Sequence, residues 1–179
     1  MRPPYGPVLW ALLLLLVATL PVGAQFFPGE EIVAWETFTS PDGAWSVEGP
    51  GAPELTEKKK GALRYAFPET GRFVTYTYDS TSAQDLLAKG QDAYFTGLLE
   101  ALGKTRPVTS SRRNSVNGWP GVRFVTEGEG VTLHQQLVVY KRNRCIRLVL
   151  GTKMSGTEIS GDIERFLGSL RIHEAAAPP

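Results

Sequence analysis

Residues 38–53, FTSPDGAWSVEGPGAP, place a tight turn, a short strand and a hinge next to one another. In the turn, Pro41 presets φ and Gly43 tolerates a positive φ. Residues 44–48, AWSVE, then alternate apolar with polar side chains, which is the pattern of a strand with one buried face. The prolines and glycine of residues 50–53 end that strand. The segment therefore predicts turn, strand and hinge in direct succession.

Similar alternation continues along most of the chain. It predicts strands at residues 32–38, 62–67, 72–79, 122–126, 131–141, 144–150 and 169–172. Residues 58–61 have the composition of a solvated hairpin tip. The apolar density of residues 137–150 indicates the centre of the sheet, whereas residues 104–121, polar on both faces, suit an edge strand.

In two segments the apolar residues follow helical spacing instead of strand alternation. The longer one covers residues 82–103, with a capping box that starts at Ser82 and with Gly103 placed to end the helix in a left-handed conformation. The second starts with a capping box at Ser155, and its apolar stripe consists of Ile159, Ile163, Phe166, Leu167 and Leu170.

These elements together predict an α+β fold, in which two helices pack on a mostly antiparallel sheet. The predicted organisation is a signal peptide at residues 1–24, an irregular lead at 25–31, a single domain at 32–173 and a disordered tail at 174–179. The mature length is close to the usual size of one domain, and no internal repeat indicates a second one.

The first 24 residues have the pattern of a secretory signal peptide. Arg2 precedes an apolar run over residues 8–20, and Pro21 and the small residues Val-Gly-Ala at 22–24 follow it. A retained membrane anchor is the alternative, but a span needs about 20 apolar residues. We therefore expect cleavage after Ala24, no transmembrane span in the mature chain, and a periplasmic or extracellular location.

The charge balance gives no reason to expect a nucleic acid or an anionic membrane as partner. Cleavage removes Arg2 and no acidic residue, so the 19 Lys and Arg of the whole chain fall to 18, equal to the 18 Asp and Glu. The mature chain then has no formal net charge.

The residues that carry most enzyme chemistry are scarce. The chain has one cysteine, Cys145, in an apolar strand-like run, and two histidines, His134 and His173. It contains no Gly-x-Ser-x-Gly elbow, no Gly-x-x-x-x-Gly-Lys phosphate loop and no group with metal-ligand spacing. We expect no catalytic, cofactor-binding or metal-binding residue and no cofactor, and a hydrolase is the least favoured function.

Aromatic residues supply the candidates for a binding surface. Core packing and cross-strand pairs account for most of them. The candidates for partner contact are Trp119, in the NGWPG turn, and Trp45, Tyr76 and Tyr78. Trp119 has an alternative role as a cover for the end of the sheet. The leading function is a non-enzymatic binding or accessory module, and the alternative is a carrier that holds a small apolar ligand in an aromatic-lined groove.

The pattern F-x-S-P-D-G-x-W-S-V-E-x-P-G-x-P resembles the start of the Mog1/PsbP-like fold and, more narrowly, of DcrB-like bacterial exported proteins. The order of elements over residues 38–172, from the hairpin and long helix to the terminal helix and SLRI, extends the resemblance. One departure is Gly49, at a position before Pro-Gly that is usually a bulky aromatic residue in such domains. The resemblance implies an α/β/α sandwich and an accessory or partner-binding role, with another envelope or secreted protein as partner. It assigns no functional residues to this sequence.

Overall fold

The computed structural model of the chain describes residues 34–68, 72–80, 83, 88–140, 143–153 and 160–174. The predicted signal peptide and lead lie outside the described residues, as does all of the predicted tail except Glu174. Within the described residues, no helix has the length and apolar character needed to cross a membrane.

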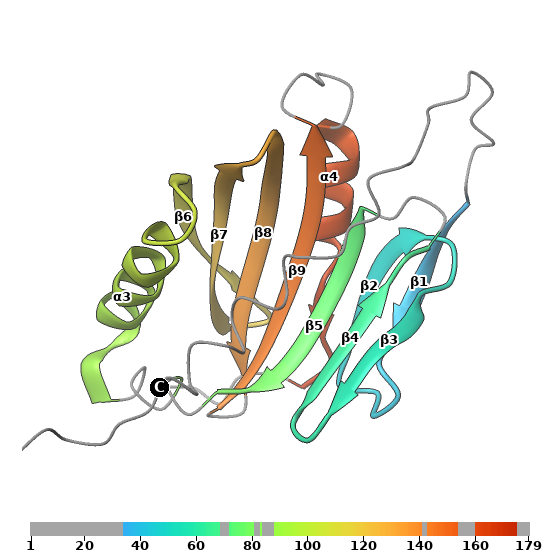
Figure 1. The fold of residues 1–179 in the computed structure, drawn as a ribbon. Helices are drawn as coiled ribbons and strands as arrows, with labels where there is room; N and C mark the ends of the chain where they lie inside the picture. The colour runs from blue at the N-terminus through green and yellow to red at the C-terminus, as the bar shows by residue number, and fades with distance from the viewer. Residues whose placement is uncertain are drawn as a thin grey trace, which may run out of the picture. The chain divides into compact units, whose positions relative to one another are not determined.

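The larger sheet is antiparallel throughout and has seven strands (Figure 1). In spatial order these are β3 (Glu54–Lys59), β4 (Ala62–Ala66), β5 (Phe73–Asp79), β9 (Arg144–Lys153), β8 (Val131–Tyr140), β7 (Trp119–Gly128) and β6 (Val108–Val116). The predicted hairpins are confirmed, and β6 is an edge strand as its polar sequence indicates. The apolar strands β9 and β8 lie in the interior of the sheet, as predicted.

A second, smaller sheet consists of β1 (Trp35–Thr39), β2 (Trp45–Pro50) and β10 (Arg171–Ile172), with β2 in the middle. The predicted turn before β2 is confirmed: Gly43 has φ 69°, and the Asp42 carboxylate accepts hydrogen bonds from the Ser40 hydroxyl at 2.7 Å and the Ala44 amide at 3.2 Å. Such a side-chain-bonded turn fixes the direction in which β2 leaves it.

Two helices are described, α3 (Gln91–Gly103) and α4 (Ser160–Gly168). The prediction of one continuous helix over residues 82–103 is wrong, because Gly90 has φ 82° and interrupts it one residue before α3. The helix ends at Gly103 as expected, but Gly103 is not left-handed, and Lys104 after it has φ −69°. The predicted capping residues Ser82 and Ser155 lie outside the described residues.

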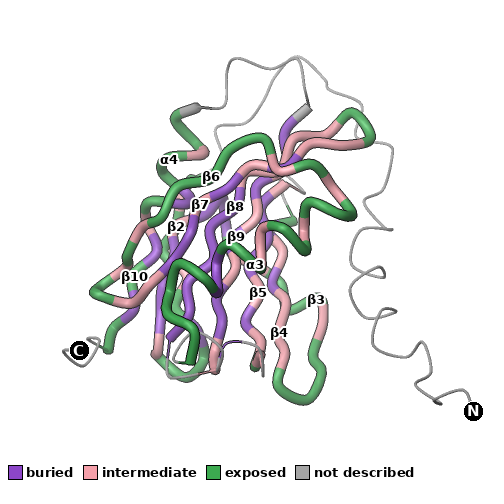
Figure 2. Tube along the Cα trace, turned by 90° about the vertical axis from the view of Figure 1, so that its left-hand side faces the viewer, coloured by how far each residue is buried: buried purple, intermediate pink, exposed green. Residues whose placement is uncertain are grey.

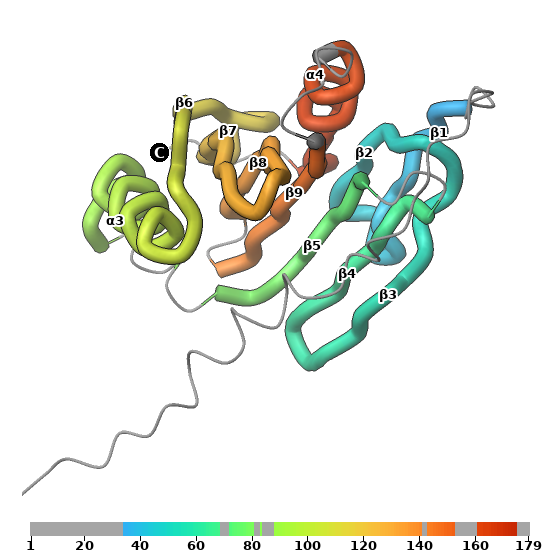
Figure 3. Tube along the Cα trace, turned by 45° about the horizontal axis from the view of Figure 1, so that its top comes forward, coloured from blue at the N-terminus to red at the C-terminus, as the bar shows by residue number. Residues whose placement is uncertain are grey.

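The seven-stranded sheet has an apolar cluster on each face. On one face α4 and the small sheet cover a cluster that includes Val138 and Tyr140 of β8, and on the other α3 covers one that includes Leu137 and Val139 (Figure 3). Figure 2 shows the resulting concentration of buried residues in β7 and β8. This layering confirms the α+β class with two helices packed on a mostly antiparallel sheet.

Candidate functional site

Two arginines flank a tyrosine in one row across the seven-stranded sheet. Arg64 of β4 is the cross-strand partner of Tyr76 of β5, and Tyr76 is in turn the partner of Arg147 of β9. Directly paired residues share a face, so all three point to the side on which α3 lies. All three are half-buried. Helix α3 packs against β6 and β7 at the opposite end of this face (Figures 1 and 3).

The first arginine of the row is held by the tyrosine. Nε of Arg64 donates a hydrogen bond of 3.2 Å to Oη of Tyr76, and its Cζ lies 5.6 Å from the centre of the Tyr76 ring. The ring therefore supports the guanidinium by both a polar contact and a cation–π contact.

The second arginine is positioned by a buried amide. Nε of Arg147 donates to Oε1 of Gln135 at 2.9 Å, and Nη2 donates to the same oxygen. Gln135 is only 1% exposed, and its Nε2 donates to Oγ1 of Thr126 at 2.9 Å. Cζ of Arg147 also lies 5.9 Å from the Phe124 ring. Since the amide uses both of its ends, it holds the Arg147 side chain in one place on the sheet. We call Arg64, Tyr76, Arg147 and Gln135 the arginine–tyrosine face.

Neither guanidinium of this face has a carboxylate partner among the described residues. The nearest candidate by register is Glu57 of β3, opposite Arg64, but its carboxylate pairs with Lys59. The hydrogen bonds of Arg64 and Arg147 to described groups use Nε of each and Nη2 of Arg147, which leaves further N–H donors available. A half-buried charge without a counterion is costly, and a planar guanidinium binds a carboxylate through two parallel hydrogen bonds. The chemistry of the face therefore fits an incoming carboxylate that lies beside the Tyr76 ring.

Tyr78, two residues farther along β5, belongs to a different environment. Its hydroxyl and that of Tyr94 hydrogen-bond to the sulfur of Cys145, which is completely buried. Burial raises the pKa of the Cys145 thiol to about 12 and also raises the pKa of the Tyr78 hydroxyl above its ordinary value. A thiol of this kind stays protonated at neutral pH, whereas a nucleophilic cysteine needs a lowered pKa.

The two tryptophans lie away from this face. Trp45 is 1% exposed and packs in the core under α4, so its ring is not presented to a partner. Trp119 is half-buried and contacts Tyr140 edge to face at 6.3 Å. Its Nε1 donates to the carbonyl of Glu174 at 2.8 Å, and the Asn117 side chain two residues earlier accepts from the Ile172 amide at 3.1 Å. Trp119 thus covers the end of the sheet and holds the C-terminal segment.

The four sequence candidates are therefore not brought together. Tyr76 and Tyr78 share a face, Trp45 lies on the other side of the sheet, and Trp119 lies at the β6–β7 turn. Sequence reasoning missed Arg64, Arg147 and Gln135. For the two arginines, the only local signal is an alternation that places each on the less apolar side of its strand, and Gln135 has no such signal because it is in phase with apolar residues of β8.

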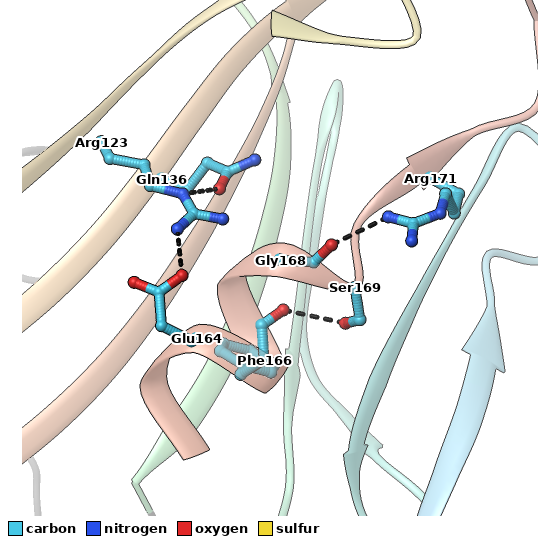
Figure 4. A network of polar contacts seen from close by, with 7 residues as sticks. All are labelled: Arg123, Gln136, Glu164, Phe166, Gly168, Ser169 and Arg171. Atoms are coloured by element: carbon cyan, nitrogen blue, oxygen red, sulfur yellow. Dashed lines mark hydrogen bonds and ion pairs between the residues drawn. The ribbon is translucent and has the colours of Figure 1, made fainter. Parts of the chain in front are cut away.

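Most of the residues that line two of the hollows on the described surface are polar. One, of about 470 Å³, lies between α3 and β6. The other, of about 290 Å³, lies near the end of α4. There Arg123 donates to Gln136 at 2.7 Å and to Glu164 at 2.8 Å, while Arg171 donates to the carbonyl of Gly168 at 2.8 Å (Figure 4). These contacts cap the helix and tie it to the sheet, so they have a structural explanation.

The described residues contain no group of three or more His, Cys, Asp or Glu side chains placed to hold a metal ion. His134 is half-buried on β8, and burial lowers its pKa below the ordinary value.

Comparison with known proteins identifies the fold. No protein-family profile and no curated protein sequence matches the chain. Among solved structures, cyanobacterial PsbP (CyanoP) from Synechocystis sp. PCC 6803 matches with a TM-score of 0.56 and 9% identity over 84% of this chain and 99% of that one. A protein from Bacteroides thetaiotaomicron VPI-5482 matches with a TM-score of 0.41 and 13% identity, over 77% of this chain and 48% of that one. Protein PA94 from Pseudomonas aeruginosa matches with a TM-score of 0.41 and 14% identity, over 68% of this chain and 84% of that one.

The first of these matches confirms the predicted Mog1/PsbP-like fold. The narrower resemblance to DcrB-like exported proteins stays a prediction.

Proposed function

We propose that this chain is an exported, non-enzymatic accessory module that binds an acidic segment of another envelope or secreted protein on its arginine–tyrosine face. The observation that carries the proposal is the row Arg64–Tyr76–Arg147, in which two half-buried guanidiniums lie beside one aromatic ring without a carboxylate partner among the described residues. An acidic side chain from a partner would supply the missing counterion and two charge-assisted hydrogen bonds.

Export is supported by the composition of residues 1–24, which combines one basic residue, an apolar run and a small-residue exit. We expect the mature chain to begin at Gln25. N-terminal mass spectrometry of the protein from its native host tests this directly, and a mature protein that still carries Met1 contradicts it.

A binding role is favoured over the two alternatives on chemical grounds. Hydrolysis by a cysteine needs a thiolate, and the pKa of Cys145 is too high to supply one at neutral pH. A carrier of a small apolar ligand needs a concave, mainly apolar site. The hollow between α3 and β6 has one aliphatic side chain, Leu99, among its lining residues, and the hollow at the end of α4 is lined mainly by polar groups.

The binding test uses a short synthetic peptide with three glutamates around one tyrosine, and its glutamine counterpart as the neutral probe. We expect the mature domain to bind the acidic peptide and not the neutral one, with an affinity that falls as salt is added. Hydrogen bonds to charged groups contribute about 1.5–3 kcal/mol each. Replacing Arg64 and Arg147 together by Gln should therefore weaken binding by a factor of ten or more.

The matched control removes two positive charges elsewhere. Lys58 and Lys60 are exposed at the β3–β4 hairpin, so the double change to Gln alters net charge equally without touching the face. If the control and the Arg64/Arg147 variant lose affinity equally, net charge rather than the face explains binding and the proposed site is wrong.

A further inference from the structure

Strand β6 leaves one long edge of the seven-stranded sheet without a described neighbour. It pairs with β7 on one side and is the last strand of the sheet on the other (Figure 1). After a register shift between Val108 and Ser110, its pairing is regular as far as Val116. Residues 109–113 are all exposed, although α3 packs against one face of the strand. A regular, exposed edge is a template for an added strand.

The opposite edge of the same sheet is protected against such pairing. Strand β3 has an irregularity between Leu55 and Glu57 near its middle. It is also rich in lysine at its end, with Lys58 and Lys59 in the strand and Lys60 just after it. Bulges and lysines are the devices by which edge strands avoid unwanted neighbours. Beyond its first residues, β6 has no irregularity of this kind in its pairing.

A hollow follows the free edge of β6 on one face of the sheet. It has a volume of about 470 Å³ between β6 and α3 and is lined by Asp92, Thr96, Leu99, Glu100, Ser111 and Arg113. Arg113 joins its two walls, since its Nε lies 3.3 Å from the Asp92 carboxylate and its Nη2 donates to the Thr96 hydroxyl at 3.1 Å.

The charges on the two sides of β6 that have no partner among the described residues differ in sign. Inside the hollow, the exposed Glu100 carboxylate has no ion-pair partner among the described residues. Asp92, by contrast, forms an ion pair with Arg113. Half-buried Leu99 lies beside Glu100, so a lysine suits this position, with its stem on Leu99 and its ammonium near Glu100. On the other face, exposed Arg112 has no described carboxylate, and its cross-strand partner is a second arginine, Arg123. An acidic side chain suits that position.

A second copy of this chain does not fit the edge equally well. Full-length antiparallel pairing of β6 with itself would place Arg112 opposite Arg112, and like charges directly opposite one another destabilise a sheet.

We infer that β6 accepts an extended segment of a partner protein as an added strand, with a basic side chain in the hollow beside Glu100 and acidic side chains beside Arg112. This surface is separate from the arginine–tyrosine face and does not depend on it. Backbone hydrogen bonds provide affinity in strand addition, and alternate side chains provide specificity.

The test uses a synthetic peptide of the length of β6, nine residues, with a central lysine, a glutamate on each side of it, and threonine and valine elsewhere. We expect it to bind and to slow amide hydrogen exchange in Val108–Val116 but not in Glu54–Lys59 of the other edge strand. The same peptide with methylated central amide nitrogens should not bind, because it cannot form the ladder.

Exchanging the charges at Arg112 and Glu100 distinguishes specific strand addition from non-specific binding of the peptide. In the double variant Arg112→Glu/Glu100→Lys, the original peptide should bind about twofold to thirtyfold more weakly, because two exposed ion pairs of about 0.2–1 kcal/mol each are lost. A peptide with lysine and glutamate interchanged should prefer that variant to the wild-type chain. Equal binding of the methylated peptide, protection in β3 instead of β6, or no change of preference overturns the inference.

Discussion

The Phe67 ring occupies the space that a side chain on Gly49 would need. A Cβ added to Gly49 would lie 2.2 Å from Cε1 of Phe67, far inside van der Waals contact. Phe67 is completely buried and meets Phe166 edge to face at 5.9 Å and Phe73 at 6.5 Å. The bulky residue that the resemblance places before Pro-Gly is absent from β2, and a ring that follows β4 fills the core at that position instead.

This relationship predicts that Gly49→Ala destabilises the domain by about 1–3 kcal/mol, because an overpacked core must shift. The matched control is Gly97→Ala in α3, where an added Cβ meets nothing within 4 Å. That change should be neutral or stabilising by about 1 kcal/mol through helix propensity. Urea unfolding measures both. In a Phe67→Ala background the cost of Gly49→Ala should shrink, and an unchanged cost would show that the two residues do not compete for space.

The lowered pKa of the Asp42 carboxyl predicts that the domain loses stability in acid. The Ser40 hydroxyl, the Ala44 amide and Arg144 lower the pKa of its carboxyl below the ordinary 3.8, against a smaller opposing effect of burial. A lowered acid pKa contributes stability above the unfolded value, and this is lost as pH falls through the folded value. Asp42→Asn should therefore flatten the pH dependence of the free energy of unfolding below about pH 4. A variant with the same acid slope as the wild-type chain would contradict this.

The burial of His134 predicts a second, separate pH dependence of the free energy of unfolding. Burial lowers its pKa from the ordinary 6.5, and nearby Glu127 opposes that effect. The unfolded chain then takes up a proton at a higher pH than the folded chain, so stability falls as pH decreases below about 6.5. His134→Gln should remove this slope while leaving the one from Asp42 in place. Thermal melts between pH 7.5 and about 5 measure it, and His173→Gln, at an exposed position, is the control.

Cys145 should react with thiol reagents only when the domain opens. Its complete burial and its pKa of about 12 mean that the native chain should be labelled far more slowly than the unfolded chain at every pH between 7 and about 9. Labelling in denaturant should be fast. Rapid labelling under native conditions that increases with pH would show that the thiol is accessible.

Trp119 should contribute to stability through its ring and its N–H separately. Trp119→Phe keeps an aromatic contact with Tyr140 but loses the hydrogen bond to the Glu174 carbonyl, at a cost of about 0.5–1.5 kcal/mol. Trp119→Ala removes the packing as well and should cost several-fold more. If both variants keep the melting temperature of the wild-type chain, Trp119 is not part of the structural cover of the sheet end.

The sequence predicts the strands better than the site for a physical reason. Alternation within β4, β5, β8 and β9 is a local property, and those strands occur where it predicts them. The predicted start of the long helix is wrong because the helix is interrupted at Gly90. That interruption depends on the backbone conformation of Gly90 rather than on apolar spacing. The row Arg64–Tyr76–Arg147 depends on the pairing of β5 with β9, strands that are far apart in the chain. No local pattern specifies that pairing, so the site was not predictable from the sequence.

The small sheet determines when the domain can finish folding. Strand β2 lies between β1 and β10, and the Glu48 amide donates to the Ser169 hydroxyl across a separation of 121 residues. A chain that emerges N-terminus first, from a ribosome or through a membrane pore, exposes the apolar side of β2 until α4 and β10 have followed. Contacts of such long range slow folding. The nascent domain therefore stays open to proteases and chaperones until almost all of it has emerged.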